Sequence, residues 1–313
     1  MAEIPLPLGE AQWEWRIHKF TLATPSFVVF NMKNADQTKE GSGISVYKDA
    51  KDQMSYSING MNAKSAAILP AGVYYFSSYT NAKTDEVTIQ TTDLNTLPTL
   101  KTGKTYKGTM NAKDYKVFKY TNKKSVQMTL KSSTKKSLKA LMGINDNSLD
   151  TDLDGQLDAT KNVSRYYIKG GTNYIIYTQA KAGAYAFKAA AKPFAETAKE
   201  TTTKNNDTYQ NASALKLGKT YKGAVHFKTD VYDYYKFTLK KKKKVTVSVK
   251  SDVVNARLYT KKGVKKNSSF KFFDSDSKKV KTVKKTYTLK AGTYYLELSG
   301  GEGYDYKYNL KVK

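Results

Sequence analysis

The hexapeptide Gly-Lys-Thr-Tyr-Lys-Gly occurs twice, at residues 103–108 and 218–223, and this repeat constrains the fold more than any other feature. After each copy comes a strand-like run of aromatic and polar residues, at 115–121 and 232–239. The spacing of the two copies is about the length of one β-sandwich domain. The repeat therefore predicts tandem β units. In each unit the hexapeptide serves as a turn glycine, a short first strand and a closing glycine.

Three segments of the chain repeat the same order of strands and turns. We predict module 1 at residues 1–94, module 2 at 95–194 and module 3 at 195–313. Module 1 is a degenerate copy that keeps only Leu-Pro-Leu-Gly at residues 6–9. The polar, threonine-rich residues 195–204 form the best candidate for a linker.

Period-2 alternation dominates all three modules. The run Val-Thr-Val-Ser-Val at residues 245–249 is typical of a strand with one buried and one wet face. Short strands separated by frequent turn signals predict antiparallel β-sandwiches. We therefore expect an all-β chain of three tandem antiparallel β-sandwiches with little helix.

The charge of the chain is strongly positive and unevenly distributed. Modules 1, 2 and 3 carry formal charges of −2, +12 and +17, which make up the net charge of +27. Such a surface attracts an anionic extracellular polymer, a nucleic acid or a membrane surface. It also fits a second reading, a solubilising lysine coat that protects strand edges. Lysine greatly outnumbers arginine, the preferred phosphate ligand, so we expect no specific nucleic-acid partner.

Five consecutive lysines, Lys240–Lys244, invite a nucleic-acid interpretation. They lie between two expected strands, where the other modules have turn residues. We therefore predict a solvated hairpin tip.

Composition and motifs also exclude several functional classes. The chain has no cysteine and two histidines, which excludes disulfides and argues against zinc or cysteine nucleophiles. It has no G-x-S-x-G, phosphate-loop or H-E-x-x-H motif. No run approaches the roughly 18 apolar residues of a membrane span, and residues 1–5 lack the basic start of a signal peptide. Either the protein is cytoplasmic or this sequence is a trimmed, mature form.

An acidic stretch in module 2 is the sharpest local motif. It places aspartates at alternate positions before Gly155, with four of the six acidic residues of the module inside nine positions. A cage of hard oxygen ligands in a tight turn suits Ca²⁺. The motif departs from an EF-hand because Lys161 replaces the bidentate glutamate. A plain solvated acidic loop is the alternative. The expected calcium ligands are Asp150, Asp152, Asp154, Gln156 and Asp158.

Module 3 resembles the bacterial pre-peptidase C-terminal domain family. The resemblance rests on Asn206-Asp207-Thr208 and on residues 212–218, 230–237, 258–259 and 289–295. It implies a jelly-roll-like sandwich that serves secreted or cell-surface bacterial proteins as an accessory, non-catalytic module. Some members bind collagen or polysaccharide, and some bind calcium near the start of the domain. Modules 1 and 2 match only the strand-and-turn skeleton of the family.

The resemblance also implies a second calcium site. The residues that match the calcium-associated positions of the family are Asn206, Asp207, Asp230 and Asp233. Glu196 and Glu200 lie upstream, where further ligands can come from. Turn and cap chemistry is the alternative, because Asn-Asp-Thr opens turns and aspartate before a strand caps a loop.

These observations predict a secreted or cell-surface protein with no catalytic activity. We expect a monomer that binds an anionic extracellular polymer or a matrix protein, or acts as a spacer, with calcium as its cofactor. The first alternative is the accessory C-terminal region of a secreted peptidase or other hydrolase. The second is an enzyme with an unrecognised carboxylate site.

Overall fold

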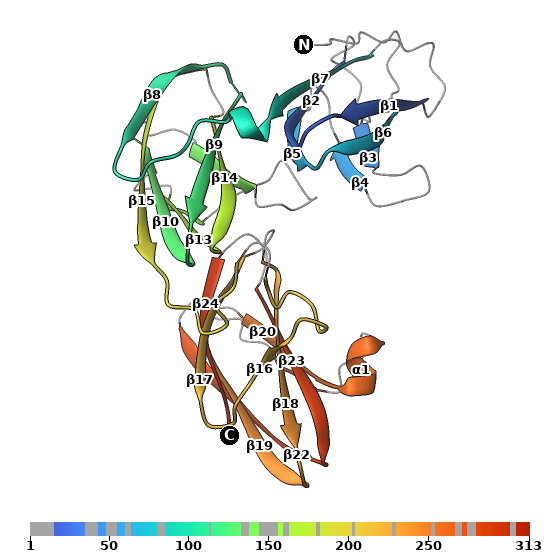
Figure 1. The fold of residues 1–313 in the computed structure, drawn as a ribbon, viewed down its shortest axis with the longest axis vertical. Helices are drawn as coiled ribbons and strands as arrows, with labels where there is room; N and C mark the ends of the chain where they lie inside the picture. Colours follow the sequence, from blue (N-terminus) through green and yellow to red (C-terminus); the bar gives the residue numbers. More distant parts are fainter. Residues whose placement is uncertain are drawn as a thin grey trace.

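A computed structural model describes most of the chain. The described residues are 16–34, 43–47, 55–59, 64–79, 85–112, 114–132, 138–143, 156–158, 163–179, 182–201, 204–226, 230–251, 254–266, 271–273, 280–300 and 305–313. Within them the chain is almost entirely β, with antiparallel sheets, which confirms the predicted all-β class (Figure 1). The helical elements in these ranges are η1 (Leu94–Thr96) and α1 (Lys261–Lys265). No helix among these residues is long and apolar enough to cross a lipid bilayer.

The strands of module 1 form two sheets, ordered β1-β6-β3-β4 and β5-β2-β7. Four consecutive residues of β2, Phe27–Phe30, are buried, whereas in β6 the buried Tyr74 and Phe76 stand at alternate positions. The strands are β1 (Arg16–Leu22), β2 (Ser26–Asn34), β3 (Gly43–Tyr47), β4 (Ser55–Asn59), β5 (Lys64–Leu69), β6 (Gly72–Tyr79) and β7 (Asp85–Asp93).

Module 2 also forms two sheets, ordered β12-β13-β10-β15-β8 and β11-β14-β9. Residues 182–197, the segment with the most helix-compatible composition, contain the long strand β15. The strands are β8 (Thr105–Met110), β9 (Tyr115–Asn122), β10 (Val126–Ser132), β11 (Leu138–Gly143), β12 (Gln156–Asp158), β13 (Val163–Ile168), β14 (Gly171–Gln179) and β15 (Gly183–Pro193).

Module 3 repeats the two-sheet arrangement, with orders β16-β18-β23-β20-β21 and β17-β24-β19-β22. One hydrophobic cluster, which runs from Leu215 to Val312, fills the space between the sheets. The strands are β16 (Ser213–Ala214), β17 (Thr220–His226), β18 (Tyr232–Leu239), β19 (Lys243–Ser251), β20 (Val254–Thr260), β21 (Lys271–Phe273), β22 (Lys281–Leu289), β23 (Gly292–Gly300) and β24 (Asp305–Val312).

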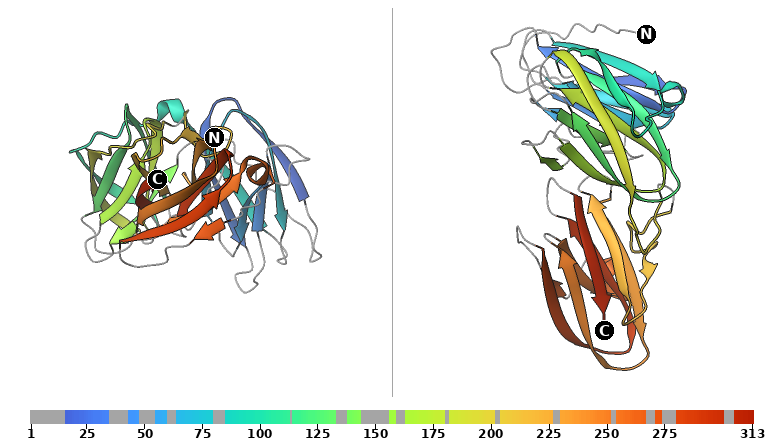
Figure 2. Two further views of the ribbon diagram at one scale, coloured as in Figure 1. Left: turned by 90° about the horizontal axis from the view of Figure 1, so that it is seen from below. Right: turned by 90° about the vertical axis from the view of Figure 1, so that its left-hand side faces the viewer.

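Module 3 forms a lobe below modules 1 and 2 (Figure 2). Each sheet draws its strands from a single predicted module. The cores are less separate, because Tyr174 and Ile176 of module 2 belong to the hydrophobic cluster of module 1. The Phe27 and Tyr115 rings also meet edge to face across this contact, 5.8 Å apart. The module limits given above stay a prediction.

One turn is built in the same way in all three modules. In the strand pairs β1–β6, β9–β14 and β18–β23, the glycine that opens the second strand (Gly72, Gly171, Gly292) lies opposite Leu22, Asn122 and Leu239. All three glycines have positive φ, so a side chain there would strain the backbone. A side chain two residues later bonds the carbonyl four residues before itself: Tyr74 to Pro70, Asn173 to Lys169 and Tyr294 to Lys290. The three turns therefore share one backbone design.

Both copies of the hexapeptide also fold alike, in the structural role predicted for them. Gly103 and Gly218 adopt φ of 83° and 87°. The Tyr106 hydroxyl accepts from the Lys101 N–H at 2.6 Å, and the Tyr221 hydroxyl accepts from the Lys216 N–H at 2.8 Å. The hydroxyl therefore ties each hexapeptide to the segment before it.

Each closing glycine of the hexapeptides faces a tyrosine on the last strand of its module. Gly108 pairs with Tyr185, and Gly223 pairs with Tyr308. A Cβ at residue 108 would lie 3.1 Å from the Tyr185 ring. A Cβ at residue 223 would lie 2.9 Å from Tyr308 Cε1 and closer still to its hydroxyl. The glycine therefore makes room for the ring.

Lys240–Lys244 are all exposed and include the turn between β18 and β19, so the turn prediction is correct. The prediction of a hairpin tip is wrong, because β18 and β19 belong to opposite sheets. The lysines lie where the chain crosses from one sheet to the other.

Candidate metal centre between modules 2 and 3

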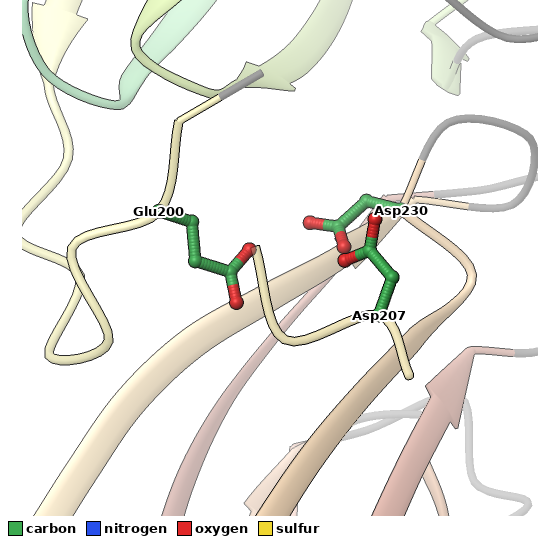
Figure 3. A group of neighbouring side chains, drawn as sticks. All are labelled: Glu200, Asp207 and Asp230. Atoms are coloured by element: carbon green, nitrogen blue, oxygen red, sulfur yellow. The ribbon is translucent and has the colours of Figure 1, made fainter. Parts of the chain in front are cut away.

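Three carboxylates of module 3 converge beside module 2 (Figure 3). Glu200 comes from the segment before the first strand, Asp207 follows Asn206, and Asp230 precedes β18. One oxygen from each lies within 4.8 Å of the others. Hard oxygen donors at this spacing are the ligands that calcium prefers.

A lysine of module 2 enters this cluster. Lys169 belongs to the turn between β13 and β14, and its Nζ lies 2.7 Å from Asp207 Oδ1, 2.9 Å from Asp230 Oδ1 and 3.0 Å from Glu200 Oε2. The Asn122 and Asn173 side-chain amides donate to the Lys169 carbonyl at 3.0 and 3.1 Å. The backbone of Lys169 is thus fixed in module 2 while its ammonium group binds module 3.

The cluster is desolvated and short of positive charge. Glu200 is 3 % exposed, Asp230 8 % and Lys169 5 %. Formally, three carboxylates face one ammonium group. Burial of unpaired charge is costly, so the site favours a proton or a further cation.

A fourth carboxylate, Asp233 on β18, lies beside the cluster and is buried. The Tyr308 hydroxyl donates to Asp233 Oδ2, and the Tyr308 and Tyr235 hydroxyls lie 2.7 Å apart. Burial raises the pKa of Asp233, and the nearby Glu200 and Asp230 carboxylates raise it further. Asp233 thus joins the acidic cluster to the interior of module 3.

The remaining titratable groups respond to the same excess of negative charge. Burial raises the pKa of Asp230, and the Lys169 ammonium group only partly opposes this. Burial alone would lower the pKa of Lys169, but Asp230, Glu200 and Asp207 raise it overall. Burial and then Glu200 raise the pKa of Glu196 to about 7, although the Ser125 hydroxyl donates to it at 2.8 Å.

The donor set fits a calcium ion. Glu200 Oε1, Asn206 Oδ1 and Asp233 Oδ1 are buried and have no hydrogen-bond partner. A spherical cation can use such oxygens without the directional demands of an N–H donor. Glu200, Asp207 and Asp230 would hold the ion. One orphaned oxygen belongs to Glu200 itself, Asn206 precedes Asp207, and Asp233 lies beside Glu200 and Asp230.

Part of the sequence-based ligand set is therefore brought together. Asp207 and Asp230 lie in the cluster, joined by Glu200. Asn206 also has a structural role. Its side-chain Nδ2 donates to the backbone carbonyl of Tyr234 at 3.1 Å, and its backbone carbonyl accepts from the Tyr234 N–H at 2.8 Å. Sequence reasoning missed Lys169, since nothing near it in sequence points to a partner in another module.

The acidic loop of module 2 lies largely outside the described residues. Asp150, Asp152 and Asp154 precede the described strand β12, which pairs with β13 at the edge of its sheet. The side chains of Gln156 and Asp158 are likewise outside the description. The calcium site at this loop stays a prediction.

Glu297 is another buried carboxylate of module 3; the protein supplies hydrogen bonds to its Oε2, whereas its Oε1 has none. The Tyr234 and Tyr259 hydroxyls donate to Glu297 Oε2 at 2.6 and 2.9 Å, and Arg257 Nη1 lies 3.5 Å from Oε1. Glu297 thereby connects neighbouring strands of one sheet. We assign it a structural role.

Comparisons with known proteins give limited guidance. No protein-family model matches the chain, and no curated protein sequence matches it. Among solved structures, a pre-peptidase C-terminal domain of a collagenase from Bacillus anthracis matches at 22 % identity with a TM-score of 0.29. The match covers 33 % of this chain and 94 % of that one.

Two other solved structures match over most of this chain. A triple jelly-roll protein of an archaeal virus has 8 % identity and a TM-score of 0.22. The match covers 99 % of this chain and 87 % of the viral chain. Tripeptidyl peptidase 2 has 7 % identity and a TM-score of 0.23. That match covers 95 % of this chain and 33 % of the peptidase chain. All these TM-scores are low, so none of the likenesses carries a function to this chain.

Proposed function

We propose that the chain is a non-catalytic extracellular protein that binds an anionic polymer, with calcium stabilising the start of module 3. The observation that carries the proposal is the outer face of the sheet β17-β24-β19-β22. We call this surface the lysine face. Its lysines are Lys222, Lys244, Lys250, Lys284, Lys307 and Lys311.

Strand register explains why these lysines share one face. Val245, Val247 and Val249 of β19 point into the core, so Lys244 and Lys250 point outward. The neighbouring strands continue the pattern, because Ser248 lies opposite Lys311 on one side and Lys284 on the other. Alternation therefore gathers distant lysines on one surface.

The four strands of the lysine face contain one acidic residue, Asp305, at the start of β24 and two residues before Lys307. Residues 220–225, 243–251, 281–289 and 307–312 include no aspartate or glutamate. Its other outward residues, such as Thr220, Ser248 and Asn309, are neutral hydrogen-bonding groups. Sulfated, phosphorylated or uronic acid polymers would bind such a surface through many weak, salt-sensitive contacts.

Calcium is proposed at Glu200, Asp207 and Asp230, where it would offset the excess negative charge. An ion bound to the native state alone stabilises folding by RT ln(1 + [L]/Kd), or about 2.7 kcal/mol at a hundredfold excess over Kd. We therefore expect calcium to raise the melting temperature over that in chelator. Asp207→Asn should reduce the effect, while Asp152→Ala tests the separate loop of module 2.

The polymer proposal is tested with heparin at low salt. The triple variant Lys244→Glu, Lys250→Glu and Lys284→Glu should weaken binding about tenfold, because it reverses charge on the proposed surface. The matched control reverses Lys240, Lys241 and Lys242 in the exposed turn, with the same change in net charge. An equal loss of heparin affinity in both variants would show that net charge, and not the lysine face, determines binding. No binding by the unaltered protein at low salt would refute the proposal.

The sequence resemblance of residues 205–313 favours one alternative, the accessory region of a secreted peptidase. The role of modules 2 and 3 would then be to hold a catalytic domain at a polymeric substrate. An upstream reading frame that encodes a peptidase domain would support this alternative. Turnover of a peptide or glycan panel by this chain alone would contradict both proposals.

A further inference from the structure

The ammonium group of Lys169 lies where a cation bound to Glu200, Asp207 and Asp230 would lie. Its Nζ is 2.7–3.0 Å from one oxygen of each carboxylate. Calcium binds oxygen at about 2.3–2.6 Å, so an ion held by the same three oxygens needs nearly the same position. Two positive centres so close together would repel strongly. The ammonium group and the ion are therefore alternatives.

The fit of the ammonium group to this position is incomplete. Lys169 donates to Asp207 Oδ1 at 2.7 Å and pairs with Asp230 Oδ1 and Glu200 Oε2, but the second Glu200 oxygen, Oε1, is buried and lies outside these contacts. A spherical ion has no N–H directions to satisfy, so these oxygens suit a metal better than an ammonium group.

We propose that Lys169 is an internal competitor for the metal. In the metal-free protein its ammonium group occupies the cation position, and a calcium ion that binds there displaces it. This inference rests on the calcium site proposed above and adds a consequence for the whole molecule. Calcium binding would break the side-chain link between module 2 and the acidic cluster of module 3.

Displacement of Lys169 would loosen the junction without separating the modules. Glu196 of module 3 still accepts from the Ser125 hydroxyl of module 2. Gly170 also pairs with Thr201 in a single parallel bridge. These contacts do not depend on the Lys169 side chain. The expected change is therefore a freed lysine at a retained junction.

Amine-reactive labelling of the unaltered protein tests the displacement directly. In chelator, Lys169 should be labelled slowly because it is buried; with calcium chloride, its labelling should increase about tenfold. Lys123, exposed in the turn that meets Gly170, is the internal reference and should be labelled equally in both conditions. Mass spectrometry of the peptides reports both lysines in one sample.

Calcium affinity supplies a second readout by isothermal titration calorimetry. If the lysine-bound form makes up about nine-tenths of the metal-free molecules, Lys169→Met should bind calcium about tenfold more tightly. Lys123→Met removes the same charge from an exposed position and should leave the affinity unchanged. The labelling needs no variant, so a poorly folded Lys169→Met protein would not prevent the test.

The outcomes separate this inference from the calcium proposal beneath it. Increased labelling of Lys169 together with tighter binding by Lys169→Met would support displacement. Calcium binding with Lys169 still protected, or with equal affinity in Lys169→Met, would overturn displacement and leave the calcium site standing. Absence of calcium binding in both proteins would overturn the two together.

Discussion

Modules 2 and 3 share a backbone design but differ in what they bury beneath the closing glycine of the hexapeptide. In module 3, Tyr308 lies over Gly223 and its hydroxyl meets Asp233 and Tyr235. In module 2, Tyr185 lies over Gly108 and joins the Tyr177 and Phe187 rings.

The positions correspond residue by residue. The carbonyls of Lys119 and Lys236 accept from the N–H groups of Leu100 and Leu215, at 2.7 and 2.8 Å. When Lys236 of module 3 is aligned with Lys119 of module 2, Tyr235 corresponds to Phe118. In the same alignment Asp233 corresponds to Lys116, which is exposed.

The difference teaches that the fold does not need the buried polar centre. Module 2 builds the same strands around an aromatic cluster, with no carboxylate at the position of Asp233. The strand pairs β9–β14 and β18–β23 therefore share their register although only one of them carries this buried carboxylate. The same scaffold supplies one partner of the centre, because Lys169 occupies in module 2 the turn position of the exposed Lys290 in module 3.

The largest expected effect separates the two closing glycines. Gly223→Ala should lower the free energy of unfolding by about 3 kcal/mol, because the new Cβ overlaps Tyr308, which is held by Asp233. Gly108→Ala should cost about 1 kcal/mol, since the Tyr185 ring can move by a few tenths of an ångström. Urea denaturation followed by circular dichroism measures both. Equal losses would show that the two tyrosines are equally constrained.

The second prediction concerns pH and the junction. The pKa of Glu196 is raised from 4.5 to about 7. Between these two pH values the native state therefore holds a proton that the unfolded chain has lost. The resulting stabilisation is complete below about pH 4.5 and is lost as the pH rises through about 7. In chelator, Glu196→Gln should therefore be more stable than the unaltered protein at pH 8 by about 2 kcal/mol, a figure reduced for partial exposure.

The control for this prediction is Glu86→Gln, which removes one charge from an exposed side chain of module 1. Thermal melting between pH 5 and pH 8 compares the three proteins. A constant difference between Glu196→Gln and the unaltered protein across this range would contradict the raised pKa.

A reciprocal exchange tests the matched core positions. Phe118→Tyr should cost about 1.5 kcal/mol, because it puts a hydroxyl among the Tyr106 and Phe187 rings. Tyr235→Phe should cost about 1 kcal/mol, because it removes the hydroxyl that meets Tyr308. Chemical denaturation gives both values. A neutral Phe118→Tyr variant would mean that module 2 can accept the polar centre.

The smallest expected effect concerns the hexapeptide tyrosines, which make the same hydrogen bonds. Tyr221→Phe should cost about 1 kcal/mol and Tyr106→Phe about 0.5 kcal/mol, because the hydrogen bonds of Tyr106 are more exposed. Melting temperatures measure the pair. A reversed order would show that burial does not set the strength of this contact.

Local patterns were sufficient to predict the β class and the role of the repeat. Alternation at residues 245–249 gave the buried face, because strand geometry itself has a period of two residues. The glycines at residues 103 and 218 marked positive φ, which few other residues adopt at low cost. The hairpin expected at Lys240–Lys244 was wrong because no local signal tells which sheet receives the next strand.

The site divides along the same line. The sequence by itself determined that Asp207 and Asp230 precede strands of one module, through a motif that resembles a calcium-associated one, and it pointed to Glu200 as a further ligand. Only the tertiary structure decided that Glu200 closes the cluster and that Lys169 of another module enters it. The physical reason is that local sequence sets strand and turn geometry. Charge pairing between modules depends on how completed sheets pack, and no local pattern encodes that packing.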